Sequence, residues 1–371
     1  MIEVFDDLGE GGIIIDTPPH RLGKPFWSDG RNFRFTEDGA RILPGNRTVF
    51  TEAEITPLWL QSFPPKTNPN WVYADLERVF GFQGGAHVEL TREVGGNYSA
   101  NPIDRWQSTV LNGVGVLNNG VDIPQAWPDF NINERLIDLP NWPADRRAKV
   151  IRSFKNFLVA LNLTDSGQPR PYRVLWSHRA VPGTLPSSWD STDPALDSRE
   201  TDLAQTADHI VDCLPLGDIN VIYKERSVWG MAEIGPPNFF RFWNILDEDG
   251  LLARDCVVAT PMGHVFVTAE DVKLHNGQPN QAQSILDRKA RKWMFQIMSK
   301  EHFQNSFAVI HPVHREVWIC FPSNMNVYPD HAIVWNWTAN TISIVEFDSL
   351  PFVASGSLGP ADIDDLTWGG A

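Results

Sequence analysis

Short apolar runs separated by compact polar turns fill the stretch between Gly217 and His275. The runs include NVIY, SVWGMAEI, FFRFWNIL, CVVA and HVFVT, and the turns between them are rich in Gly, Pro, Asn and Asp. Runs of about four to eight residues rich in Val, Ile, Phe and Trp, bounded by such turns, are typical of short antiparallel strands. No run here has the length and the period of an amphipathic helix. We therefore expect a series of hairpins, in which the DEDG loop at 247–250 links two groups of strands.

The same pattern extends over most of the chain. A hairpin is predicted around the TEDG turn at 36–39, and Asn-Gly turns follow at 112–113 and 119–120. Asp-Gly and Asn-Gly pairs favour tight turns because they tolerate the positive φ that such turns require. The exception is residues 281–301, where apolar residues recur at helical spacing with Arg and Lys between them. There we expect one short helical insertion.

A repeat underlies these hairpins. Val221, Val265 and Val309 are separated by 265 − 221 = 44 and 309 − 265 = 44 residues. A repeat of about 40–50 residues, each with four short strands, matches the blade of a β-propeller. The sequence thus predicts an all-β protein, a β-propeller of about six four-stranded antiparallel blades, with five or seven also open. Two stacked sandwiches would not explain the repeated step.

Three regions are expected along the chain: an N-terminal arm at 1–24, a β-propeller domain at 25–350 and an acidic C-terminal tail at 351–371. The arm could dock onto a neighbour or pack on its own domain. The hairpin after it is expected to close the ring against the last blade. Residues 180–208 are rich in Pro, Ser and Asp, and they form either a partner-facing loop or a solvated insertion.

Charge and cysteine usage narrow the function classes. With 31 basic and 46 acidic residues the formal charge is −15, which is the wrong sign for a general nucleic-acid-binding surface. Cys213, Cys256 and Cys320 lie in apolar runs without close spacing, so we expect buried thiols in a reducing compartment. We find no signal-peptide pattern at the N-terminus and no apolar run near the roughly 20 residues that span a bilayer, so no membrane insertion is expected.

Catalytic motifs are not found. The Gly-rich segments lack the GK[ST] ending of a P-loop, and neither GxSxG nor HExxH occurs. His311 and His314 flank a turn and could form a metal pair, but no third ligand is close in sequence and a solvated turn is favoured. Asp247, Glu248 and Asp249 cluster in one loop, where an acidic surface is favoured over a glycosidase carboxylate pair. We therefore predict no enzyme activity, no cofactor and no metal.

One resemblance covers most of the chain, from about residue 25 to 347. It is carried by the order of these blocks: FWSDGRNFRFTEDGARILPG, VLNNGVDIPQAW, VLWSHR, PSSWD, GDINVIYKERSVWGM, HVFVTAEDVKLHNG, EVWICFPS and AIVWNW. Their succession resembles the nozzle or tail-hub proteins of short-tailed bacteriophages. The resemblance implies a β-propeller core and a homo-oligomer, a hexamer, that forms a tube below the portal and adaptor proteins. It also implies contact with tail fibre or needle proteins, transient non-specific passage of double-stranded DNA, and no catalytic residues.

These expectations give a structural protein of the virion that is assembled in the bacterial host cytoplasm and conducts the genome during ejection. An acidic inner wall would keep the DNA polyanion from adhering, so Asp247, Glu248 and Asp249 are candidates to line the lumen. The alternative is a carbohydrate-binding or glycan-processing propeller that contacts the host cell surface. In that case Trp189, in the long polar loop, would be an exposed binding residue.

Overall fold

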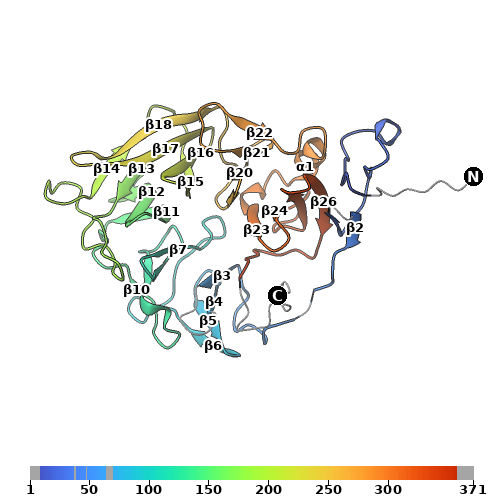
Figure 1. The fold of residues 1–371 in the computed structure, drawn as a ribbon. Helices are drawn as coiled ribbons and strands as arrows, with labels where there is room; N and C mark the ends of the chain where they lie inside the picture. Colours follow the sequence, from blue (N-terminus) through green and yellow to red (C-terminus); the bar gives the residue numbers. More distant parts are fainter. Residues whose placement is uncertain (1–8, 37–38, 47, 64–69, 357–371) are drawn as a thin grey trace, which may run out of the picture. The chain divides into compact units, whose positions relative to one another are not determined.

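Six antiparallel sheets of four strands each make up most of the molecule (Figure 1). The computed structural model describes residues 9–36, 39–46, 48–63 and 70–356. Each four-stranded sheet takes its strands from one continuous stretch of chain. The chain thus folds as a six-bladed β-propeller, as the sequence predicts. It divides into two compact units, which are described separately: unit 1 comprises Met1–Asn46 and Ile245–Pro351, and unit 2 comprises Arg47–Asn244 and Phe352–Ala371.

Unit 2 contains blades 1 to 4, of which the fourth extends to Asp247 in unit 1. Blade 1 consists of β3 (Trp59–Phe63), β4 (Asn70–Ala74), β5 (Val79–Gln83) and β6 (Ala86–Glu89). Blade 2 consists of β7 (Gln107–Leu111), β8 (Val114–Asn118), β9 (Gln125–Trp127) and β10 (Ile137–Asp138), with the 3₁₀ turn η2 (Pro128–Phe130). Blade 3 consists of β11 (Arg146–Phe154), β12 (Phe157–Asp165), β13 (Gln168–Trp176) and β14 (Arg199–Asp202). Blade 4 consists of β15 (Ile210–Leu216), β16 (Ile219–Lys224), β17 (Ser227–Gly235) and β18 (Phe239–Asp247).

Unit 1 contains blades 5 and 6 together with an N-terminal hairpin. Blade 5 consists of β19 (Val257–Thr260), β20 (Gly263–Val267), β21 (Val272–His275) and β22 (Ala282–Ser284). Blade 6 consists of β23 (Phe307–His311), β24 (Glu316–Phe321), β25 (His331–Asn336) and β26 (Thr341–Glu346). The hairpin is β1 (Phe33–Thr36) and β2 (Gly39–Ile42), and the helical elements are η1 (Pro19–Arg21), α1 (Arg291–Ile297) and η3 (Phe303–Asn305).

Aromatic residues fill the space between blades 3 and 4. The ring of Phe240 lies edge-on to Phe157 at 5.1 Å and to Trp176 at 5.2 Å between centroids. All three side chains belong to one buried apolar cluster. Edge-to-face pairs of this kind add to the hydrophobic stabilisation of the large buried ring surfaces. The many Trp and Phe residues of the sequence therefore serve, at least here, to pack one blade on the next.

Polar contacts also join the first strands of successive blades. Between blades 2 and 3, the Thr109 and Ser153 hydroxyls lie 2.8 Å apart. Between blades 3 and 4, the Arg152 guanidinium donates to both carboxylate oxygens of the fully buried Asp212, at 3.0 and 2.8 Å. A bidentate pair fixes geometry as well as charge. Blades 2, 3 and 4 are thus positioned against one another by directional bonds in addition to the apolar core.

The 44-residue step relates equivalent strands in one pair of blades, but in the next pair it relates strands that are not equivalent. Val221 in β16 and Val265 in β20 both lie on the second strand of a blade, but Val309 lies on β23, the first strand of blade 6. First strands of successive blades begin between 39 residues (146 − 107) and 64 residues (210 − 146) apart. The long step contains the Pro/Ser/Asp-rich loop. The blade is therefore the repeating unit, and its period varies with its insertions.

The helix expected at 281–301 is present but much shorter, at Arg291–Ile297. Its predicted N-terminal part instead contains β22, which pairs with β21 through contacts such as Leu274 with Gln283. The helix begins where the Asp16 carboxylate accepts hydrogen bonds from the backbone N–H groups of Lys292 and Trp293, at 2.7 and 3.0 Å. Sheet pairing of β22 and capping by the distant Asp16 thus both set the N-terminal end of the helix, and neither is visible in local periodicity.

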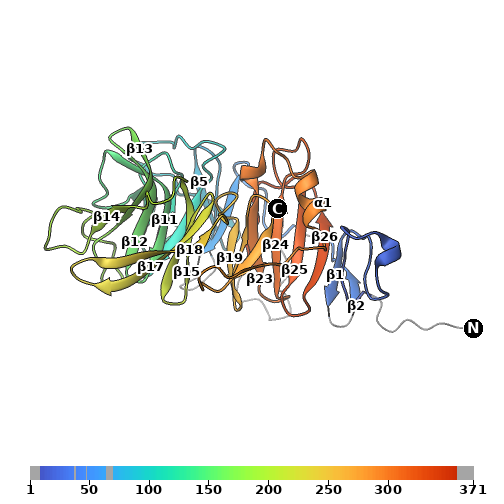
Figure 2. The same cartoon turned by 90° about the horizontal axis from the view of Figure 1, so that it is seen from above.

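The described part of the N-terminal arm packs on its own unit (Figure 2). Ile13 is buried in a cluster with Phe35 and Ile344, and its N–H donates to the Ile342 carbonyl at 2.9 Å. The hairpin β1–β2 lies beside β26, the last strand of blade 6, in both views. Because β23–β26 already form a complete sheet, the hairpin supplies no strand to a blade. The expectation that it closes the ring is therefore wrong in that sense.

The end of the described chain returns to unit 2. Phe352 packs against the apolar cluster that contains Trp59 and Trp106, and the Arg105 guanidinium lies 5.6 Å from its ring centroid. Of the predicted acidic tail at 351–371, residues 351–356 are described, and residues 357–371 lie outside the described ranges.

Candidate functional site

The acidic loop follows the last strand of blade 4. Asp247 is the final residue of β18, and both Asp247 and Glu248 are exposed. Glu248 has a φ of 68°, in the left-handed region, so the chain turns sharply there. Asp249 is half-buried, and its Oδ1 accepts a bond from Lys273 Nζ on β21 at 2.5 Å. Among the described residues, Asp247 and Glu248 have no ion-pair partner, so their two negative charges lie on the exposed side of the loop.

Lys273 is the partner that sequence reasoning missed. It lies 24 residues after Asp249 and is brought to it only because β21 passes beside the start of the link between the blades. The pair reduces the acidity that the sequence assigns to the loop, and it ties Asp249 to blade 5. Of the three lumen candidates, Asp247 and Glu248 therefore remain the ones that present charge to solvent. Their place in a lumen stays a prediction.

His311 and His314 do come together, with ring centroids 4.5 Å apart. His311, the last residue of β23, is buried, whereas the turn that follows it, with His314, is exposed, so the expectation of a solvated turn is right for His314 and wrong for His311. Burial, with further contributions from His314 and Arg34, lowers the pKa of His311 to about 3, so the ring is neutral at neutral pH. Over the described ranges, no group of three or more His, Cys, Asp or Glu residues could hold a metal ion. His311 thus packs within blade 6, and His314 covers it from the exposed turn.

Trp189 is 2% exposed, so the expectation of an exposed carbohydrate-binding tryptophan is wrong. Its ring packs edge-on to Trp142 at 4.7 Å between centroids. Both belong to an apolar cluster with residues of blades 2 and 3. The loop at 180–208 is likewise more than a solvated insertion, because it contributes β14 and buries Trp189. The specific support for the carbohydrate alternative at this position is lost.

The three cysteines are free and buried, as expected. Burial raises the pKa of the Cys213 thiol to about 12 and also raises that of Cys320. Thiols held in this way are poor nucleophiles. Cys213 lies on β15, Cys320 lies on β24, and Cys256 directly precedes β19, so all three are packing residues.

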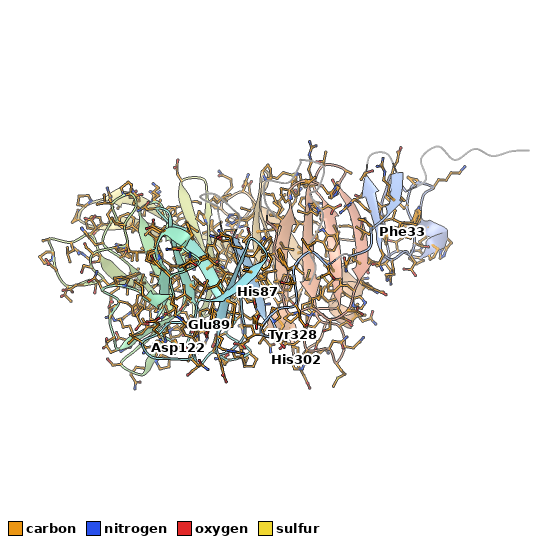
Figure 3. The ribbon with its side chains drawn as sticks, turned by 90° about the horizontal axis from the view of Figure 1, so that it is seen from below. Phe33, His87, Glu89, Asp122, His302 and Tyr328 are labelled. Atoms are coloured by element: carbon orange, nitrogen blue, oxygen red, sulfur yellow. The ribbon has the colours of Figure 1, made fainter. Side chains whose placement is uncertain are left out.

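His87, on the outer strand of blade 1, is a further histidine that could suggest chemistry (Figure 3). Its Nδ1 lies 2.8 Å from the Tyr73 hydroxyl and its Nε2 lies 2.9 Å from the Thr51 hydroxyl. The ring also contacts Phe82 at 4.8 Å between centroids. Both ring nitrogens are thus engaged by neighbouring side chains, which fits a positioning role for the segment around Thr51.

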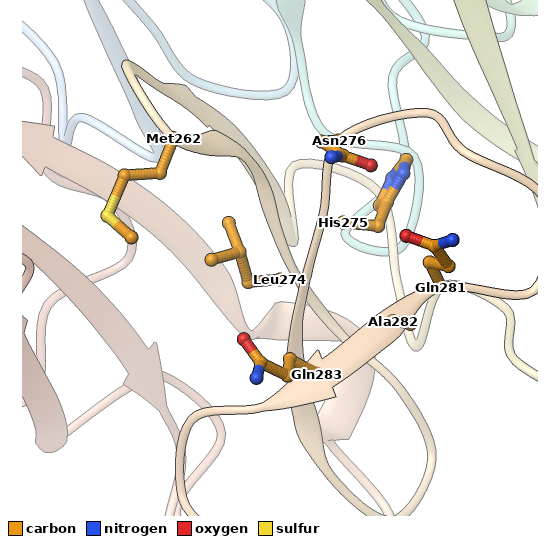
Figure 4. A pocket seen from close by; sticks show the side chains of 7 residues that line it. All are labelled: Met262, Leu274, His275, Asn276, Gln281, Ala282 and Gln283. Atoms are coloured by element: carbon orange, nitrogen blue, oxygen red, sulfur yellow. The ribbon is translucent and has the colours of Figure 1, made fainter.

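A hollow on blade 5 was not anticipated from the sequence (Figure 4). Its volume is about 410 Å³. Leu274 on β21 and Gln283 on β22 are directly opposite each other in the sheet, and Met262 projects from the β19–β20 turn. Exposed amide side chains occupy much of its rim. The lining comprises Met262, Leu274, His275, Asn276, Gln281 and Gln283, with Ala282 between the last two.

No helix in the described ranges is long and apolar enough to cross a membrane. No protein-family model and no curated protein matches the sequence. Several solved structures are similar in fold. Apo AztD from Citrobacter koseri is 10% identical, with 76% of this chain and 84% of that chain covered and a TM-score of 0.42.

Selenomethionine-substituted virginiamycin B lyase from Staphylococcus aureus is 9% identical, with 78% and 85% of the two chains covered and a TM-score of 0.45. The computationally designed protein Ika8 is 10% identical, with 79% and 88% covered and a TM-score of 0.44. These are likenesses of fold alone.

Proposed function

We propose that this chain is a structural protein of a short-tailed bacteriophage. It forms a homohexameric ring or tube below the portal and adaptor, contacts tail fibre or needle proteins, and conducts the DNA genome during ejection. The observation that carries the proposal is the ordered series of sequence blocks over about residues 25–347, which resembles nozzle and tail-hub proteins. A β-propeller is the fold that this resemblance implies. One such block, GDINVIYKERSVWGM at 217–231, covers β16 and the first part of β17 in blade 4.

The charge of the chain supports the same function. A protein with a formal charge of −15 repels a polyanion, and a conduit benefits from a wall to which DNA does not adhere. Asp247 and Glu248 are exposed and have no ion-pair partner in the described part of the chain. We assign these two side chains to the lumen wall, with Asp249 held behind them by Lys273.

The direct test is to find the chain in the particle. Phage particles that carry this gene would be purified and analysed by quantitative mass spectrometry and by immunogold electron microscopy with an antibody against the purified protein. We expect about six copies per particle and label at the tail. A particle without this chain, or label confined to the capsid, would overturn the proposal.

The lumen assignment has its own test. A reconstruction of the assembled ring should place Asp247 and Glu248 on the inner wall, and a basic or neutral wall would refute the assignment. The double variant Asp247→Lys/Glu248→Lys should still assemble but should slow DNA release from triggered particles. Asp218→Lys, in the exposed β15–β16 turn, adds positive charge elsewhere and serves as the control. Equal ejection rates for the two variants would argue against a charged conduit wall.

A further inference from the structure

We propose that the hollow on blade 5 binds a neutral saccharide unit. This goes beyond the conduit function and does not depend on it. The site is built entirely from β21, β22, the link between them and the β19–β20 turn, all within unit 1. Its volume, about 410 Å³, lies within the roughly 300–1,000 Å³ of small-molecule sites. It is large enough for one or two sugar rings.

The lining carries no net charge. None of its residues is acidic or basic, apart from His275. Burial, together with the neighbouring His264, lowers the pKa of His275 to about 4, so this ring is neutral at neutral pH. A phosphate, a nucleotide or an acidic sugar would lose hydration here without finding a counter-charge. The ligand class is therefore neutral.

The rim offers hydrogen bonds that the protein itself does not use. The side-chain amides of Gln281 and Gln283 make no hydrogen bond to any described residue, and both are exposed. Asn276 uses its Oδ1 to accept the Gln278 N–H at 3.2 Å, which fixes the orientation of its amide group. Each amide presents both donors and an acceptor. Hydroxyl groups, which also donate and accept, are the natural complement to such a mixed set.

An apolar wall adjoins these amides. Leu274 is half-buried and lies directly across from Gln283, while Met262 is 49% exposed at the tip of the hairpin (Figure 4). A pyranose ring has an apolar C–H face bordered by hydroxyls, so it matches a wall of two aliphatic side chains beside a polar rim. A wholly apolar ligand would leave the amides desolvated and unpaired. The arrangement thus favours a sugar over a lipid or an aromatic metabolite.

Gly263 allows this wall to form. Its φ is 133°, and a Cβ there would lie 2.2 Å from the His275 carbonyl oxygen. Only glycine lets the β19–β20 turn approach β21 this closely. A side chain at this position would push the hairpin, and Met262 with it, away from Leu274. The backbone thus sets the width of the hollow.

The experiment begins with the purified full-length chain on an array of neutral and anionic glycans. The strongest neutral glycan is then titrated by calorimetry. Gln281→Ala/Gln283→Ala should weaken its binding at least tenfold, whereas Gln278→Ala, an exposed amide of the same loop outside the lining, should stay within twofold. Both variants should keep the wild-type unfolding midpoint. The Met262 methyl resonance of the wild-type protein should shift on titration, which reports on the site without any substitution.

The proposal is overturned if no neutral glycan binds, if only anionic glycans bind, or if the double variant binds as tightly as the wild type. An unchanged Met262 methyl resonance at saturating glycan also overturns it. A competition experiment adds one more outcome: if an extended peptide displaces the glycan more strongly than free sugar does, the site is a peptide site and the proposal is overturned. The double variant should still be incorporated into particles. Failure of glycan binding and failure of the tail assignment are therefore separate results.

Discussion

Lys224 is the residue whose replacement should most clearly expose how blade 4 is held together. Its side chain is fully buried at the end of β16. The Nζ donates to the carbonyls of Leu203 and Thr206 at 2.9 and 2.8 Å and to the Thr206 hydroxyl at 2.6 Å. It also lies 3.0 Å from Asp208 Oδ1. One ammonium thus anchors the segment between blades 3 and 4 to the sheet.

Lys224→Met keeps the length of the side chain and removes its charge. It leaves a buried carboxylate at Asp208 with only the Arg226 N–H at 2.9 Å and the Ser227 hydroxyl at 3.0 Å, together with its contact to Thr206. Removal of one partner from a buried ion pair costs about 3–5 kcal/mol, because the other charge stays desolvated and unpaired. This is a large share of the roughly 5–15 kcal/mol by which domains are usually stable.

The pH dependence follows from Asp208. Burial alone would raise the pKa of its carboxyl, but hydrogen bonds from Thr206, Lys224, Arg226 and Ser227 outweigh burial and hold the pKa below the usual value. A lowered pKa gives stability that is present above the unfolded-state pKa and is lost as pH falls through the folded-state value. In the variant the Asp208 carboxylate lacks the Lys224 ammonium. Protonation of Asp208 at low pH should therefore remove the cost of its buried, unpaired charge. The difference between variant and wild type should therefore shrink as pH falls below about 4.

Urea unfolding followed by tryptophan fluorescence at pH 7 and again near pH 3.5 measures both effects. Lys155→Met is the matched control, because Lys155 is exposed and its Nζ lies 3.3 Å from Glu233 at the surface. Such a surface pair contributes at most about 1 kcal/mol. A loss of less than about 1 kcal/mol for Lys224→Met, equal to that of the control, would refute the anchoring role.

Three further outcomes are expected. The Arg173 side chain holds the pKa of Asp202 below its usual value by a hydrogen bond, so Arg173→Gln should flatten the loss of stability as pH falls below about 4, in urea titrations over a pH series. Trp189→Ala should lower the free energy of unfolding by about 3–5 kcal/mol in the same assay, because the ring is buried against Trp142. A loss below about 1 kcal/mol would contradict the burial of Trp189. The Cys213 thiol should resist a disulfide-exchange reagent in the native state and react at once in urea, and fast native reaction would contradict its burial.

Most of the fold could be predicted because each blade is local. Strands such as β16 and β17 are neighbours in sequence and in space, so their apolar runs and the turn between them are enough to predict the pairing. The chain around Ile285 is different. Its apolar spacing indicates a helix, yet its neighbour β22 pairs with β21, and α1 begins only where Asp16 caps it from more than 270 residues away. Long-range partners override local propensity, and a single sequence does not display them.

The candidate site shows the same limit. The acidic cluster at 247–249 can be recognised directly in the sequence, but the neutralisation of Asp249 by Lys273 depends on the position of β21 in the fold. The polar surroundings of Trp189 predict exposure, whereas Trp142, 47 residues earlier, covers it. The hollow on blade 5 joins one turn to two strands through side chains of ordinary surface type. No spacing rule distinguishes Gln281 and Gln283 from other exposed amides.

The proposed conduit function would leave little for a motif search to find, for a physical reason. Catalysis needs a few residue types converging within hydrogen-bond reach, so its signature is concentrated. A tube needs a rigid wall and the right sign of charge, and both are distributed over the whole chain. In the proposed conduit, directional contacts between neighbouring blades, such as Arg152 with Asp212, would add to the rigidity, and the charge would come from an excess of 46 − 31 = 15 acidic residues. Under this proposal single substitutions should rarely abolish function, whereas reversal of charge at Asp247 and Glu248 together should slow DNA passage while leaving the proposed ring intact.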